Sequence, residues 1–252
     1  MFKPTPYRER RVLRALEGAW TRFEAVLDRL SASPADGARP RINFNPFYHL
    51  GTLSIVLLLV LLLTGVYLTI LYKPGPDRAY ASLMAIDATW FGSLMRSMHR
   101  YASDGLVVVL LLHALKMLLN DRFWGGRWLA WVSGIVLLVL IVIIGAMGYF
   151  LVWDRQAQWL GEYFMNFLSG DTRLTFASPQ GISGAFQFFV IILFLHVFLS
   201  LLITLGIWIH EMRLQRPRLW APRWLMITTT LVIAALSLTL PVASEAAADL
   251  TH

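Results

Sequence analysis

The sequence has no cysteine among its 252 residues. Disulfide bonds, thiolate-ligated iron–sulfur clusters and cofactors attached through thioether bonds are therefore excluded. Charged residues are also scarce, at 15% of the chain, whereas hydrophobic residues make up 57%. A soluble domain carries about 25% charged residues. Several apolar stretches reach the length of about 20 residues that crosses a bilayer. We therefore expect an all-α, polytopic transmembrane helix bundle.

The sequence shows no cleavable signal peptide, because the N-terminal segment 1–41 is charged and never forms an apolar run. The formal net charge of +7 would suggest a nucleic-acid partner in a soluble protein. Here the basic residues cluster at the ends of the apolar stretches, which is typical of a topological signal. We therefore expect no nucleic-acid partner and a lipid bilayer around the chain.

Three segments follow from the hydrophobic pattern. Residues 1–41 form an arginine-rich arm whose apolar residues recur every three or four positions, which predicts an amphipathic helix on the membrane surface: Val12, Leu16, Trp20, Phe23, Leu27 and Leu30. Residues 42–212 hold four candidate spans, and residues 213–252 form a link, a fifth span and a short tail. The predicted spans are 48–72, 93–120, 127–150, 184–211 and 223–243, and the longest loop runs from 154 to 184.

The distribution of basic residues predicts the orientation. Sixteen of the 22 lysines and arginines lie in the arm and in the links that follow the second and fourth spans, and six lie on the other side. Positive charge favours the cytoplasmic side. We therefore expect a multi-pass protein of the bacterial cytoplasmic (inner) membrane, with its N-terminus in the cytoplasm and its C-terminus outside.

Four histidines form two pairs of equal spacing. His99 and His113 occupy positions i and i+14 of the second span, and His196 and His210 repeat this spacing on the fourth. Fourteen helical residues return to within about 40° of the same face and rise about 21 Å. Both spans run in the same direction, so His99 is expected to face His196 at the outer level and His113 to face His210 at the inner level.

Two imidazoles from facing helices are axial ligands suited to haem iron. Two bis-histidine haems, stacked across the membrane, would form an electron path. The first alternative is that each histidine is only a polar residue bonded to a neighbour, although ionisable groups within spans are costly and usually functional. The second is zinc, but two ligands at each level leave a tetrahedral site half filled.

Glycines repeat the same period on the other two spans of the core. Gly51 and Gly65 occupy positions i and i+14 of the first span, as do Gly134 and Gly148 on the third. Glycine lets a flat macrocycle approach the backbone. Small residues in ordinary membrane helix packing are the alternative.

The chain resembles the N-terminal di-haem module of cytochrome b in the cytochrome bc family. The paired histidines and glycines carry this resemblance, together with RSMHRY at 96–101, GRWLAWVSG at 126–134 and GAMGYFLVWD at 145–154. The resemblance implies two haem b groups, with His99 and His196 on a low-potential outer haem and His113 and His210 on a high-potential inner one. It also implies that Arg96 and Lys116 pair with haem propionates.

The sequence departs from the family around the outer quinol site. The family's Pro-Glu-Trp-Tyr motif is absent, the loop after the third span is shorter than is usual in the family, and Leu-Val-Trp replaces Leu-Pro-Trp at 151–153. The loop keeps Trp153 and Trp159, which are candidates for a quinone site. The fifth span has no ionisable residue between Arg223 and Glu245. Proton acceptance from quinol is therefore expected to need a carboxylate from another polypeptide.

His49 is a candidate for a cytoplasmic-side quinone site. It precedes Gly51 at the inner level, and a histidine can deliver a proton to reduced quinone. An ordinary interfacial histidine is the alternative reading.

The resemblance implies a split cytochrome b subunit that carries electrons across the membrane in a quinol-oxidising, proton-translocating complex of the quinol–cytochrome c oxidoreductase type, inactive alone. The expected partners are a separate chain with the C-terminal half of cytochrome b, a Rieske iron–sulfur protein and a c-type cytochrome, in a dimeric complex with quinone as substrate. The alternative is a di-haem b-type membrane anchor of another respiratory dehydrogenase or reductase that exchanges electrons with quinone at a single site.

Overall fold

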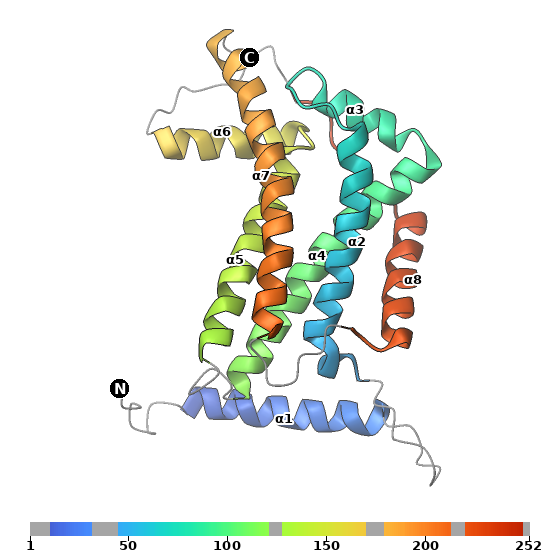
Figure 1. Ribbon diagram of the computed structural model, residues 1–252, viewed down its shortest axis with the longest axis vertical. Helices are drawn as coiled ribbons and strands as arrows, with labels where there is room; N and C mark the ends of the chain where they lie inside the picture. The colour runs from blue at the N-terminus through green and yellow to red at the C-terminus, as the bar shows by residue number, and fades with distance from the viewer. Residues whose placement is uncertain (1–10, 32–44, 121–127, 170–178, 213–219, 249–252) are drawn as a thin grey trace.

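The regular structure is helical throughout the described part of the chain. The computed structural model describes residues 11–31, 45–120, 128–169, 179–212 and 220–248. Figure 1 shows upright helices that form a bundle, with one helix lying across each end. The predicted all-α class is confirmed.

Within the described residues, four helices are long and apolar enough to cross a membrane. They are α2 Leu50–Leu71, which follows the short 3₁₀ helix η2 Pro46–His49, then α4 Trp90–Leu119, α5 Trp128–Phe150 and α7 Pro179–Met212. A shorter apolar helix, α8 Arg223–Thr239, has 17 residues. At about 1.5 Å per residue it spans about 25 Å, the lower limit for a crossing. The five predicted spans therefore correspond to four long helices and one short one.

The long helices associate as two pairs. The most extensive contacts join α2 to α4 and α5 to α7. A buried cluster that includes Leu57, Ala102, Leu106, Ile141 and Ile203 joins the pairs through the middle of the bundle. Among the described residues, α4 and α7 make at most marginal backbone contact. The two helices that carry the histidine pairs therefore face each other across space that side chains or a ligand must fill.

Two further helices lie in segments that were expected to be links or loops. Helix α3 Ala79–Asp87 follows α2, and α6 Arg155–Ser169 occupies the first half of the predicted 154–184 loop. The loop prediction was wrong for residues 155–169, because α6 is an amphipathic helix whose apolar residues are too dispersed to resemble a span. In Figure 1, α6 lies across the end of the bundle opposite α1.

The junction between α3 and α4 sets the start of the first histidine helix. Thr89 caps α4 by accepting a hydrogen bond from the Gly92 amide at 3.0 Å. A Cβ atom at Gly92 would lie 2.1 Å from the Ile86 carbonyl oxygen, so only glycine fits. The chain turns tightly here, and the turn fixes where α4 enters the bundle.

Helix α1 Arg11–Ser31 contains the residues of the arm whose apolar side chains recur every three or four positions. It lies across the end of the bundle near the start of α2 (Figure 1). The Phe23 ring packs edge-on against Phe47 with 5.4 Å between centroids, and Asp28 accepts hydrogen bonds from Asn45 and Tyr48. Leu16 and Val26 remain about half exposed, at 50% and 52%. The predicted helix is present, and it is anchored to the bundle by both apolar and polar contacts.

Candidate functional site

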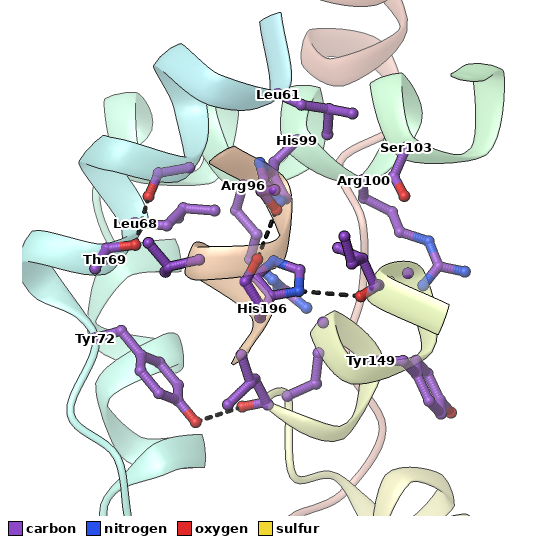
Figure 2. Close-up of a pocket in the computed structure, with 18 of the residues that line it drawn as sticks. Leu61, Leu68, Thr69, Tyr72, Arg96, His99, Arg100, Ser103, Tyr149 and His196 are labelled. Atoms are coloured by element: carbon purple, nitrogen blue, oxygen red, sulfur yellow. Dashed lines mark hydrogen bonds between the residues drawn. The ribbon is translucent and has the colours of Figure 1, made fainter. Parts of the chain in front are cut away.

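We call the α6 end of the bundle the outer end and the α1 end the inner end, after the expected orientation. The outer histidines meet as the spacing predicts. The ring centroids of His99 on α4 and His196 on α7 are 6.3 Å apart, with 55° between the ring planes. Both line a cavity of about 690 Å³. Figure 2 shows the two side chains reaching into this cavity from their separate helices.

The outer cavity is mostly apolar and large enough for a cofactor or a small molecule. Apolar residues of α2, α4, α5 and α7 form most of its wall, and Gly65 and Gly148 line it beside the histidines. The polar residues of the wall include Arg96, Arg100, Tyr149, Gln156 and Glu245, and also Asp104, which lies five residues further along α4 than His99.

The inner histidines also occupy a common level. His113 on α4 and His210 on α7 interact electrostatically. In the described part of the chain, no cluster of three or more histidine, aspartate or glutamate side chains is placed to hold a metal ion. Paired imidazoles are therefore the donor sets that these residues offer.

Each glycine of the repeat faces one histidine. A Cβ atom at Gly65 would lie 3.2 Å from the His99 ring, and one at Gly148 would lie 2.9 Å from the His196 ring. At the inner level, Cβ atoms at Gly51 and Gly134 would each lie 3.4 Å from His113 and His210, respectively. The glycines therefore make room for the imidazoles themselves, and the fit is tighter at the outer level.

Three of the four rings have a bonded Nδ1 atom. The Thr64 hydroxyl donates to the Val60 carbonyl at 2.7 Å, so it accepts from His99 Nδ1–H at 3.0 Å. Ser133 likewise donates to Ala130 and accepts from His210 Nδ1–H at 2.9 Å. A proton on Nδ1 leaves the Nε2 lone pair available, which is the arrangement of a metal-ligating histidine with an outer-shell partner.

The third partner is a backbone carbonyl exposed by a glycine. His196 Nδ1 donates to the Ile144 carbonyl at 3.0 Å, and Ile144 lies four residues before Gly148. A helical side chain leans over the preceding turn and would cover that carbonyl. The Leu61 carbonyl, four residues before Gly65, also interacts with the His99 ring. Glycine thus provides both the space and the acceptor for the ring.

Arg96 is buried at the outer end of α4 and has several partners. Its Nη1 donates to Asp87 and to the Val242 carbonyl, and its Nη2 donates to Ser244. Burial raises the pKa of the Asp87 carboxyl, although the Arg96 charge acts in the opposite direction. When Asp87 is protonated, Arg96 is left with a positive charge that another carboxylate can neutralise.

Lys116 is buried at the inner end of α4. Its Nζ contacts Glu24 of α1 at 2.8 Å and donates to the Phe47 carbonyl at 2.9 Å. It also lies 4.8 Å from the centroid of the Tyr48 ring. Lys116 therefore joins the arm to the bundle, a role that the sequence did not suggest.

The segment after α8 folds back over the outer end of the bundle. Tyr101 donates to the Leu240 carbonyl, the Val242 amide donates to Ser97, and an isolated β-bridge joins Asp154 to Ala247. These bonds place Glu245 on the cavity wall. At this level we expected a carboxylate only from another polypeptide. Glu245 of this chain reaches it because hydrogen bonds with α4 redirect the tail.

The remaining candidates lie in three different settings. His49 packs edge-on against Trp224, with 6.2 Å between centroids, at the inner end of α2. Trp153 is fully buried and packs against Phe189 at 4.8 Å, whereas Trp159 is 67% exposed and stacks on Tyr163. Neither indole lines the outer cavity, so their contact with quinone stays a prediction.

The residues present fit haem. A propionate-bearing macrocycle needs imidazole ligands that face each other, room at the helix surface beside them, and cations for its carboxylates. The paired histidines, the glycines of the repeat and a buried cation at each end of α4 supply these. At the outer level they surround a cavity of about 690 Å³.

Comparison with known proteins gives the family. The family model described as cytochrome b/b6/petB matches residues 38–170. Cytochrome b6 of Mastigocladus laminosus is 37% identical over 121 residues, which are 48% of this chain and 55% of that protein. Cytochrome b6 of Heliobacterium modesticaldum is 34% identical over 134 residues, covering 53% and 63%. The matches thus span little more than half the length of these relatives. Because the family model covers more than half of the chain and includes His99 and His113, this protein belongs to the cytochrome b/b6 family.

Proposed function

We propose that this chain is a di-haem cytochrome b subunit that carries electrons across the membrane in a quinol-oxidising, proton-translocating bc-type complex. Membership of the cytochrome b family implies haem binding. The observation that carries the proposal is the pair of histidine–glycine layers, which recur at the same spacing on all four helices of the core. Haem bound at both layers would supply one-electron transfer at two depths.

His99 and His196 are the proposed ligands of the outer haem, and His113 and His210 those of the inner haem. Thr64, Ser133 and the Ile144 carbonyl bond the Nδ1 atoms of three of these rings. Arg96 and Lys116 are proposed partners of the propionates, because a buried cation at each end of α4 stabilises a carboxylate there. The acidic side chains Asp87 and Glu24 already contact these cations and would share them.

The proposed location is a bacterial cytoplasmic membrane, with the α1 end of the bundle in the cytoplasm. The excess of basic residues in the arm and in the links at that end supports this orientation. Half-exposed Leu16 and Val26 on α1 would contact the lipid surface. Cysteine labelling at residue 17 and at residue 77, with a reagent that cannot cross the membrane, tests the two sides.

The proposed partners are a polypeptide that supplies the Pro-Glu-Trp-Tyr motif, a Rieske iron–sulfur protein and a c-type cytochrome, in a dimeric complex. The motif does not occur in the 252 residues of this sequence. The test is to purify the native complex, identify every co-purifying subunit and measure quinol-driven reduction of its haems. Absence of an iron–sulfur subunit and of reduction from the outer side would instead support a single-site di-haem anchor.

His49 is the proposed proton donor of a quinone site on the cytoplasmic side. It lies at the inner end of α2, two residues before Gly51, which faces His113. A His49→Ala variant should slow quinone reduction and change inhibitor sensitivity on that side. Unchanged rates with unchanged inhibition would leave His49 as a packing partner of Trp224.

A further inference from the structure

Helix α1 meets the inner end of the bundle with an acidic face. The residues of this face are partly buried and follow a helical period, whereas the other described residues of α1 are exposed: Glu17, Trp20, Glu24, Leu27 and Asp28. Three of these five residues are acidic. The arginines Arg22 and Arg29 lie among the exposed residues. The arm therefore turns negative charge toward the bundle and positive charge away from it.

Lys116 meets this face from the inner end of α4. Its Nζ atom contacts Glu24 at 2.8 Å and donates to the Phe47 carbonyl at 2.9 Å. An ammonium group has three N–H donors, so these two bonds leave one for a further acceptor. Asp28, the next acidic residue of the face, accepts instead from Tyr48. Among the described acidic side chains, Glu24 is thus the one that forms an ion pair with Lys116.

The charge of Lys116 also acts on the inner histidine of α4. Lys116 follows His113 by three residues, a rise of about 4.5 Å along the same helix, and the two side chains interact electrostatically. The Lys116 side chain is only 10% exposed and that of Glu24 only 20%. Salt and water screen buried charges much less than exposed ones. A charge on α1 therefore influences the inner histidine level through Lys116.

From these contacts, and resting on the proposed function, we infer that Glu24 lowers the reduction potential of the inner haem by offsetting the positive charge of Lys116. Reduction adds one electron to the haem. A cation nearby favours that electron, and a carboxylate paired with the same cation opposes it. Glu24 acts through Lys116 and is a positioning residue, not a ligand. It thus adjusts the driving force for electron transfer from the outer haem to the inner one.

The same coupling acts in the reverse direction. Docking of Glu24 favours the oxidised haem, so reduction of the haem must weaken the docking of α1 by the same factor, because a coupling between two sites is reciprocal. Apolar contacts such as that of Phe23 with Phe47 also hold α1, so the helix should loosen without detaching. Reduction of the inner haem should therefore increase hydrogen exchange of the α1 amides.

The test is a redox titration of the purified complex that follows the absorption of both haems. Glu24→Gln should change the ferric–ferrous equilibrium of the inner haem about tenfold toward the ferrous form, an upward shift of about 59 mV in its midpoint potential. Glu24→Asp retains the charge and should shift the potential less. The matched control is Glu17→Gln, which removes the same charge about 10 Å away along α1 and should leave the potential unchanged. The outer haem should not respond to any of these variants.

A Glu24→Gln variant with the same inner-haem potential as Glu17→Gln would overturn the inference. A lower potential would also overturn it, because an arm that only shields the haem would, on loosening, admit water that stabilises the ferric form. Hydrogen exchange of the oxidised and reduced wild type provides a second measurement if a variant fails to assemble, and equal exchange of α1 in the two states would count against Glu24. If the wild type contains no inner haem, the proposed function itself fails.

Discussion

At the scale of single residues, the histidine–glycine pairs determine how closely a ring can approach a helix. The four glycines are equivalent in sequence, but the contacts of an added Cβ atom range from 2.9 Å at Gly148 to 3.4 Å at Gly51 and Gly134. Contacts below 3.0 Å require a shift, whereas 3.4 Å is at the edge of ordinary van der Waals contact. The outer level should therefore tolerate substitution less well than the inner level.

Replacing Gly148 by alanine should displace the His196 ring and weaken its bond to the Ile144 carbonyl. We expect loss or a changed spectrum of the outer haem, whereas Gly134→Ala should retain both haems. Reduced-minus-oxidised absorption spectra of the two purified variants provide the comparison. Equal effects of the two substitutions would contradict the ring-clearance argument.

The Thr64 hydroxyl is the second residue-scale feature, because it accepts from His99 Nδ1–H. Thr64→Val has nearly the same shape but removes this acceptor. Outer-shell partners of metal-ligating histidines are typically worth about 10- to 100-fold in metal affinity, so haem should dissociate more readily from the outer level. Thr52→Val is the matched control on the same helix, since Thr52 bonds the His49 carbonyl and, among the described residues, no histidine ring. A haem-retention assay that shows no difference between the variants would sink this assignment.

At the scale of elements, the docking of α1 depends on one charged contact as well as on apolar packing. In the ion pair between Lys116 and Glu24, the lysine side chain is 10% exposed and the glutamate side chain 20%. Breaking a buried pair costs about 3–5 kcal/mol. Glu24→Gln should therefore increase hydrogen exchange of the α1 amides. Glu17→Gln, which removes the same charge from α1 away from Lys116, should leave their exchange unchanged. Similar exchange in both variants would mean that apolar contacts alone hold the arm.

The sequence predicted the long helices well, because apolar length and the repeated histidine spacing are read directly from it. It missed α3 and α6, which are short or amphipathic and carry no continuous apolar run. The Nδ1 partners could have been found, since Thr64 and Ser133 each directly precede a glycine of the repeat. The path of the tail could not be predicted, because it depends on hydrogen bonds between the side chains of Arg96, Ser97 and Tyr101 and backbone groups that are far away in sequence.

At the scale of the whole molecule, the two helix pairs form a frame around a central space. The outer end contains the cavity, Arg96 and the tail with Glu245, and the inner end contains His49, Lys116 and α1. The two ends thus carry different polar groups, as the proposed function, with quinol on one side and quinone on the other, requires. Between the two ends, the helices have exposed apolar faces that lipid or partner subunits would cover.

The most direct measurement of the central claim is the haem content of single-histidine variants. The purified wild-type complex should contain two b haems per chain, each with the low-spin spectrum of bis-histidine ligation. His99→Ala or His196→Ala should lose the outer haem and keep the inner one, and His113→Ala or His210→Ala should do the reverse. Haem quantitation with redox titration distinguishes the two haems by their potentials. Two haem equivalents that survive any of the four substitutions would contradict the account.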